Sequence, residues 1–192
     1  DHLDHSMKFA AIHPKPVLYN FEPADMLIAF AGKHDMVVVG HTLVWHSQTG
    51  RWFFQSEDDD RSATREVAME RLKDHITTVV GRYNGRVIGW DVVNEAIDDR
   101  SNGETENLRN YSWYQTVGPD VLTMAFKWAH EADPDAELYY NDYGIEDGAV
   151  RNTGKHASSL MLLRRLIEEG APIDGVGIQG HWTLNTNLED VE

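Results

Sequence analysis

A glutamate that ends an apolar run is the residue of this sequence best placed for acid–base chemistry. Glu95 closes the run GWDVVNE, in which Trp90 and Asn94 are close neighbours. A carboxyl group at the end of a strand, beside an amide and aromatic rings, loses part of its hydration, and this raises its pKa. We therefore predict a raised pKa for Glu95 and a role as a general acid near neutral pH. A solvated loop glutamate is the alternative interpretation.

Further polar and aromatic side chains follow other apolar runs. They are His41, Trp45 and His46 in GHTLVWHSQ, Asn94 before Glu95, Asn141, Asp142 and Tyr143 after ELYY, and Gln179, His181 and Trp182 in GVGIQGHW. Amide and imidazole groups bind hydroxyl groups, and indole rings offer flat apolar faces. His41 and Trp45 are therefore suited to line a sugar site. The alternatives are a turn residue for Asn94, a helix cap for Asp142 and a buried structural histidine for His181.

A metal site is the rival interpretation of the histidines, because imidazole is the commonest metal ligand. The spacing of His41 and His46 does not match the HExxH pattern, and no acidic residue lies in their run. The chain contains no cysteine, which excludes thiolate sites and disulfides. We expect neither a metal nor another cofactor.

Apolar runs that alternate with amphipathic segments must position these side chains. The predicted strands are Met36–Val44, Val87–Val93, Glu137–Tyr140 and Gly175–Ile178, and their continuous apolar character is typical of strands buried on both faces. The predicted helices bury Ala68, Leu72, Ile76, Val79, Val80 and Tyr83 in one case, Val121, Leu122, Ala125, Trp128, Ala129 and Ala132 in another, and Leu160, Leu163 and Ile167 in a third. A shorter helix after Pro23 is expected to turn Leu27, Phe30 and Ala31 inward.

This alternation indicates a parallel sheet, as either an open doubly wound sheet or a closed (β/α)₈ barrel. The sequence has neither GxGxxG nor GxxxxGK[ST], which disfavours the open sheet. Polar residues instead follow every strand, where a barrel builds its site. A complete barrel takes about 250 residues, whereas these 192 contain four clear strands and a fifth strand end near Leu3–Lys8.

Composition excludes two classes of partner. The chain has a net charge of −15, so nucleic acid and anionic membrane surfaces repel it. No apolar run reaches the roughly 18 residues that a membrane helix needs. A neutral polysaccharide remains compatible with this charge.

The blocks described above, in their order, resemble the family 10 glycoside hydrolases. GHTLVWHSQT resembles the strand 3 block, WDVVNEA the strand 4 block, YYNDYG the strand 5 block and GVGIQGHW the strand 6 block. IHPKP followed by Tyr19–Asp25 resembles the segment between strands 2 and 3. The resemblance implies that residues 1–192 are a partial catalytic domain. Its fold is a (β/α)₈ TIM barrel, here from about the end of strand 2 to the helix after strand 6.

The resemblance also implies an activity, the retaining hydrolysis of internal β-1,4 bonds in xylan or xylo-oligosaccharides. Retention requires two carboxyl groups about 5–5.5 Å apart, and Glu95 matches the family's acid/base. Asn94 matches the amide that holds the sugar 2-hydroxyl, and Lys8, His41 and Trp45 match residues that line the non-reducing side of the site. Gln179 and His181 match the residues that position the two catalytic carboxylates. Tyr143 matches a contact on the leaving-group side. The resemblance further implies a secreted or periplasmic protein whose leader lies outside these residues.

Two departures from the family pattern qualify this expectation. The nucleophile, a Glu in a Thr-Glu-Leu-Asp block on strand 7, has no counterpart in these residues. Asp4-His5-Ser6 also stands where the family has Glu-Asn and one further residue before Met-Lys. We therefore expect the 192 residues alone to be inactive. The alternatives are a xylan-binding remnant, a non-functional fragment, and a β-1,4-glucanase on the same barrel.

Overall fold

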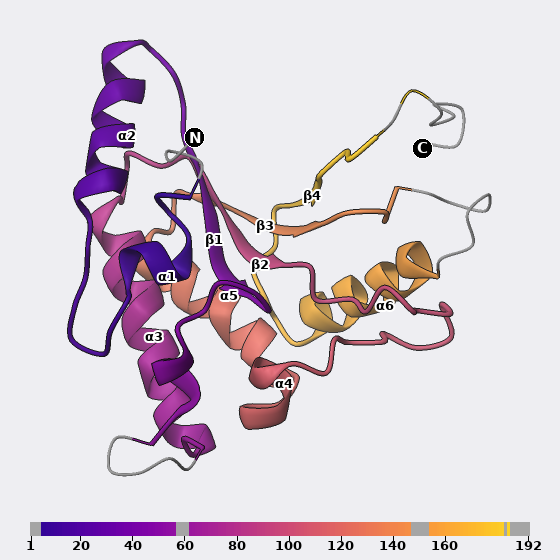
Figure 1. Ribbon diagram of the computed structural model, residues 1–192. Coiled ribbons are helices and arrows are strands. Elements are labelled where there is room, and N and C mark those ends of the chain that lie inside the picture. The colour runs from indigo at the N-terminus through magenta and orange to yellow at the C-terminus, as the bar shows by residue number, and fades with distance from the viewer. Residues whose placement is uncertain (1–4, 57–61, 147–153, 183, 185–192) are drawn as a thin grey trace.

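The computed structural model describes residues 5–56, 62–146, 154–182 and 184. Its elements, in chain order, are α1 (Phe9–Ile12), α2 (Glu22–Lys33), β1 (Val39–Trp45), the 3₁₀ turn η1 (Arg51–Phe54), α3 (Arg65–Arg82), β2 (Gly89–Asn94), α4 (Ser112–Thr116), α5 (Asp120–Ala132), β3 (Glu137–Asp142), α6 (Lys155–Glu168) and β4 (Gly175–Ile178). Figure 1 shows α3, α5 and α6 on the same side of the strands. The predicted alternation of strands and helices is confirmed.

The described strands form one parallel sheet in the order β1-β2-β3-β4. The register places Trp45 opposite Asn94, and Asn94 opposite Asn141. Asn141 lies opposite Gly177 in turn. Because all four strands run in the same direction, the residues that follow them collect at one edge of the sheet.

The helices α3 and α5 form where the sequence pattern predicts them. Thr64 begins α3, its hydroxyl accepting the Val67 N–H at 3.4 Å, as expected of an N-cap threonine. The predicted inward face of α3 is fully buried, and the predicted face of α5 is buried except for Ala132, which is partly exposed but packs against the core. The sheet contributes Trp90, Val92, Leu138 and Tyr140 to the same core, each with no exposed surface.

Two predicted helix faces are only partly right. In α2 Ala31 is buried and Leu27 packs against the core as predicted, whereas Phe30 is 51% exposed. In α6 Leu163 packs against the core beside the buried Leu162 and Leu166, while Leu160 and Ile167 are exposed. Both helices carry apolar residues on more than one face, so spacing alone does not identify the side that packs on the core.

The strand bounds also differ from prediction. The sheet begins at Val39 instead of Met36, and the first three strands extend to Trp45, Asn94 and Asp142 because cross-strand pairing continues past the apolar runs. Residues 5–8 form a turn instead of a strand end, and residues 3–4 of the same prediction lie outside the described residues. Residues 98–110 form a loop between β2 and α4.

The sheet is open within the described part of the chain. Strand β4 pairs only with β3, and its Val176 and Ile178 are 45% and 48% exposed. The side chains of His41, Asp91 and Tyr139, which alternate with buried residues along their strands, are partly exposed. The strands are therefore not buried on both faces as predicted. No helix in the described ranges is long and apolar enough to cross a membrane.

Close packing between the first two strands gives a stability prediction. A Cβ atom at Gly40 would lie 2.3 Å from the ring of the fully buried Trp90. We expect Gly40→Ala to lower the free energy of unfolding by about 1–3 kcal/mol through overpacking. Urea unfolding of the full-length protein that contains this chain measures the change.

Gly32 provides the matched control. It lies in α2, and apart from its chain neighbours and the backbone of its own helix no atom lies within 4 Å of the position that a Cβ would take there. Gly32→Ala should therefore raise the free energy of unfolding by about 0.5–1 kcal/mol through helix propensity. A Gly40→Ala protein as stable as wild type would contradict the close packing of Gly40 on Trp90.

Candidate active site

Glu95 lies at the centre of the edge where the strands end. It is the first residue after β2, the strand between β1 and β3, and its φ of 54° is in the left-handed region. Its backbone N–H donates to the carbonyl of Asn141 at 2.8 Å. The turn out of β2 is therefore anchored to β3 and directs the Glu95 side chain among residues from three other strand ends.

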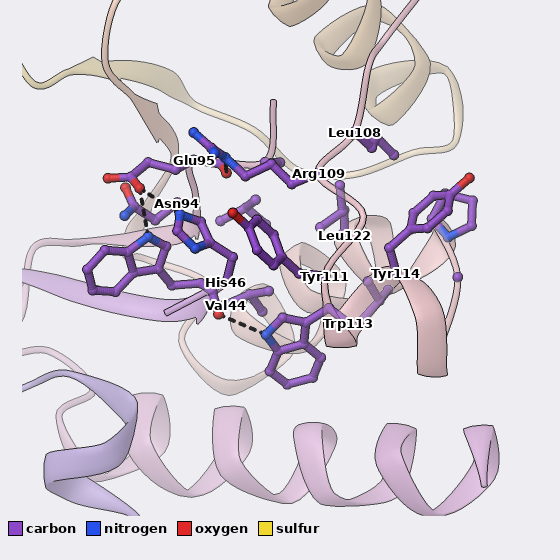
Figure 2. Close-up of a pocket in the computed structure, with 16 residues that line it drawn as sticks. Val44, His46, Asn94, Glu95, Leu108, Arg109, Tyr111, Trp113, Tyr114 and Leu122 are labelled. Atoms are coloured by element: carbon purple, nitrogen blue, oxygen red, sulfur yellow. Dashed lines mark hydrogen bonds and ion pairs between the residues drawn. The ribbon is translucent and has the colours of Figure 1, made fainter. Parts of the chain in front are cut away.

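Three side chains donate hydrogen bonds to the Glu95 carboxylate. Trp45 Nε1 and His46 Nε2 lie 2.9 and 3.0 Å from Oε2, and Gln179 Nε2 lies 2.9 Å from Oε1. Figure 2 shows Glu95, Asn94 and His46 close together at one end of the pocket. The carboxylate side chain is 12% exposed. These donors come from the ends of β1 and β4, so the carboxylate is held from both sides of its own strand.

The predicted rise in the pKa of Glu95 is wrong for this arrangement. Burial raises the pKa, but the hydrogen bonds from His46, Gln179 and Trp45 together outweigh burial and lower it to about 2. Each donor stabilises the ionised form. Among the described residues, Glu95 is therefore a carboxylate at neutral pH.

Asn94 organises the amides beneath this carboxylate. Its Oδ1 accepts from Asn141 Nδ2 at 2.9 Å and from Gln179 Nε2 at 3.2 Å. Gly177 makes the approach possible, because a Cβ there would lie 2.4 Å from Asn141 Oδ1. Asn94 Nδ2 is buried and has no hydrogen-bond partner in the part of the chain that the structure describes. The Asn94 Nδ2 group can therefore donate a hydrogen bond to an acceptor on a ligand.

Gln179 connects this cluster to His181. Gln179 Oε1 lies 2.8 Å from His181 Nε2, so the imidazole N–H donates to the same amide that donates to Glu95. His181 is exposed, which removes the alternative of a buried structural histidine. Tyr143 lies next to it, with 6.4 Å between the ring centroids.

The predicted sugar-lining residues Lys8, His41 and Trp45 lie close together, and Trp45 contacts Glu95. Lys8 Nζ is 5.3 Å from the centroid of the Trp45 ring and 2.8 Å from Nδ1 of His5. His41 lies 6.0 Å from Trp45 between ring centroids, and its Nδ1 is 2.8 Å from Asp91 Oδ2. The structure thus brings Lys8 and His41 to Trp45, and Trp45 to Glu95.

His46 and Arg109 also belong to the cluster; the sequence places His46 among the polar residues that follow the first strand without giving it a role, whereas it does not predict Arg109 there. His46 donates to Glu95 and stacks on Tyr111 with 4.6 Å between ring centroids. A narrow pocket of about 50 Å³ lies beyond it, lined by Tyr111, Trp113 and other residues (Figure 2). The position of His46 directly after a strand is the available signal, whereas Arg109 lies in a loop without any pattern.

Asp142 is neither a free carboxylate nor a cap of α6, whose N-cap is Gly154. It is fully buried, and its oxygens lie 2.8 Å from Lys155 Nζ and 2.6 Å from the Tyr140 hydroxyl. No group of three or more His, Asp or Glu residues within the described ranges is arranged to hold a metal ion.

A parallel sheet with α3, α5 and α6 on one side, and polar side chains gathered at the carboxyl ends of its strands, fits the class of β/α-barrel proteins. The chain belongs to glycosyl hydrolase family 10, whose model matches residues 3–192. The described sheet and helices are accordingly part of a (β/α)₈ barrel.

Named relatives agree with this assignment. A β-1,4-xylanase from Dictyoglomus thermophilum is 48% identical over 181 residues, which cover 94% of this chain and 47% of that protein. The crystal structure of xylanase XynB from Paenibacillus barcinonensis matches with a TM-score of 0.89 at 42% identity, over 98% of this chain and 54% of the other. The intracellular xylanase TsXylA from Thermoanaerobacterium saccharolyticum, solved with xylotriose, gives 0.89 at 40% identity, over 98% and 57%. The chain therefore spans about half the length of these relatives.

The donors around Glu95 give a second prediction. Gln179→Met removes one hydrogen bond to the carboxylate with little change in volume, so the pKa of Glu95 should rise above its wild-type value. The pKa is measured by carboxyl ¹³C NMR titration of the full-length protein, with Glu95→Gln to assign the signal. In the control Gln115→Met, an exposed amide away from Glu95 is lost, and the pKa should not change. An unchanged pKa in Gln179→Met would contradict the arrangement.

Proposed function

We propose that the protein containing this chain is a retaining endo-1,4-β-xylanase in which Glu95 is the acid/base. The observation that carries the proposal is the Glu95 carboxylate, held by Trp45, His46 and Gln179 at the carboxyl ends of parallel strands. The family assignment and relatives named as xylanases support it. Residues 1–192 then form part of the catalytic domain.

The neighbours of Glu95 take roles that fit their contacts. Asn94, with its unpartnered buried N–H among the described residues, holds the sugar 2-hydroxyl. Lys8, His41 and Trp45 line the non-reducing side of the site. Gln179 and His181 position the catalytic carboxylates, and Tyr143 contacts the sugar on the leaving-group side.

The reaction proceeds in two balanced steps. In the first, Glu95 gives its proton to the glycosidic oxygen while a second carboxylate bonds to the anomeric carbon, and the shortened xylan leaves. In the second, Glu95 takes a proton from water, whose oxygen attacks that carbon and releases the carboxylate. The second carboxylate is the family's strand 7 glutamate, which has no counterpart in these residues.

This second carboxylate reconciles the low pKa of Glu95 with a role as an acid. Two carboxyl groups about 5–5.5 Å apart repel each other when both are ionised, and this raises the pKa of one of them. The pKa of about 2 applies to Glu95 surrounded by its hydrogen-bond donors without that neighbour. We propose that the nucleophile raises this pKa into the working range of an acid.

The substrate is xylan or a xylo-oligosaccharide. A neutral polysaccharide suits the acidic chain, whose net charge is −15. Export to the periplasm or the medium belongs to the same proposal. Comparing hydrolysis of xylan with that of β-1,4-glucan distinguishes the proposal from a glucanase on the same barrel.

Substitution of Glu95 tests its role in the full-length protein. Glu95→Ala should reduce the rate of xylan hydrolysis by roughly 10²–10⁴-fold, the usual contribution of general acid catalysis. The first step with an aryl xyloside that has a good leaving group should be spared, because such a group needs little protonation. Added azide should restore the second step by replacing the base-activated water. Stopped-flow and steady-state assays measure these rates.

The matched control is Glu70→Ala, which removes a carboxylate from α3 outside the site and should change neither rate. Equal losses on both substrates in Glu95→Ala, without rescue by azide, would show that Glu95 is not the acid/base.

A further prediction concerns the 192 residues by themselves, which we expect to release no sugar from xylan. Among the described carboxylates near the site, Asp91 is engaged by His41, and Asp142 by Lys155 and Tyr140. Neither is available to bond to the anomeric carbon. Reducing-sugar release by the purified chain should equal that of its Glu95→Gln variant. Release above this control would mean that another carboxylate within the chain acts as the nucleophile.

A further inference from the structure

Arg109 is a buried cation that the role of Glu95 as acid/base leaves without an assigned task. The loop between β2 and α4 returns it to the site: Ile97 and Leu108 form an antiparallel bridge, and the Arg109 N–H donates to the Ala96 carbonyl at 2.8 Å. Only 6% of the Arg109 side chain is exposed. The guanidinium therefore lies beside Glu95, although the two residues are 14 positions apart.

The guanidinium donates in three directions. Its Nε donates to the backbone carbonyl of Glu95 at 2.9 Å. Its Nη1 and Nη2 donate to the two oxygens of Asp99 at 3.0 and 2.7 Å, and Nη2 also donates to the Tyr143 hydroxyl at 2.8 Å. The Tyr143 hydroxyl donates in turn to Asp99 at 2.5 Å. One planar group thus touches both the backbone of Glu95 and the phenol of Tyr143.

The backbone of Glu95 needs this support. A residue other than glycine in the left-handed region is strained and persists only when its surroundings fix it. Glu95 has a φ of 54°, its N–H is bound by the Asn141 carbonyl, and its own carbonyl is bound by Arg109. Arg109 therefore provides one of the two backbone contacts that fix the direction of the carboxylate.

We propose that Arg109 is a positioning residue that aligns Glu95 with Tyr143, so that the proton donor and the leaving-group contact keep a fixed relation. This inference rests on the proposed function of Glu95 and Tyr143. It explains why a guanidinium is needed, since the ammonium of lysine donates from a single nitrogen and cannot reproduce the planar fork.

The charges around Arg109 keep this contact constant with pH. Burial raises the pKa of Asp99, but the hydrogen bonds from Arg109 and Tyr143 outweigh it and lower the pKa to about 2. Lys155 lies over the ring of Tyr143, with Nζ 3.7 Å from the ring centroid and 3.5 Å from Asp99 Oδ1. The arrangement therefore stays charged throughout the range in which a glycosidase works.

The test uses Arg109→Met and Arg109→Lys in the full-length protein. We expect kcat on xylan to fall roughly 10²-fold, the effect of a displacement near 1 Å. On an aryl xylobioside with a good leaving group, which needs little protonation, the loss should stay below about tenfold. A 2-fluoro xylobioside that traps the covalent intermediate counts the folded, active molecules, so that kcat is expressed per active site.

A second measurement does not depend on activity. Displacing the Glu95 backbone weakens the donors to its carboxylate, so the pKa of Glu95 should rise in both Arg109 variants when measured by ¹³C NMR. The matched controls are Arg82→Met and Arg82→Lys, which remove a guanidinium fork on Asp25 at the end of α3. Neither the substrate ratio nor the pKa should change in these controls.

The outcomes separate the two proposals. Equal losses on both substrates, or a wild-type ratio per active site with an unchanged pKa, would overturn the role of Arg109. If Glu95→Gln hydrolyses xylan as fast as the wild type, the proposed function is overturned. The NMR measurement would then still show whether Arg109 fixes the position of Glu95. If Arg109→Met does not fold, Asp99→Asn loosens the guanidinium without removing it, and the same leaving-group dependence is expected.

Discussion

The parallel pairing of β2 between β1 and β3 is the constraint on which the rest of this structure depends. It sets Asn94 opposite both Trp45 and Asn141, so the residue after β2 emerges between two neighbouring strand ends. A carboxylate there can receive donors from β1 on one side and from β4 on the other. A shift of one residue in either pairing would reverse the faces of the paired side chains and separate these groups.

Two opposing effects act on the Glu95 carboxylate. Partial burial favours the neutral acid, whereas three fixed donors favour the anion, and the donors prevail. The site is therefore organised around the conjugate base, the form that must activate water in a retaining mechanism. In the proposed mechanism the acid form depends on a further negative charge nearby, supplied by a residue on another strand.

The sequence allowed the elements with one clear apolar face to be predicted. The faces of α3 and α5 follow the helical period, and Thr64 and Pro119 mark their starts. The face of α6 could not be predicted in this way, because its leucines surround the helix and only tertiary packing selects Leu162 and Leu166.

Site residues that directly follow strands could likewise be predicted to converge, since parallel strands end at one edge. Arg109 could not, because a bridge between loop residues Ile97 and Leu108 brings it back to Glu95. The direction of the Glu95 pKa shift also escaped prediction. It depends on donors that are 49 to 84 positions away in the chain, and no local pattern records them.

The hydrogen bond between the Trp45 indole and Glu95 has an optical consequence. Indole fluorescence responds to charge and to proton donors in direct contact with the ring. The Trp45 Nε1 lies 2.9 Å from a titrating carboxylate oxygen, and the carbonyl of the same residue accepts a hydrogen bond from the indole of Trp113. We therefore expect the emission of Trp45 to change when Glu95 ionises, which would make this indole a spectroscopic reporter of protonation at the site.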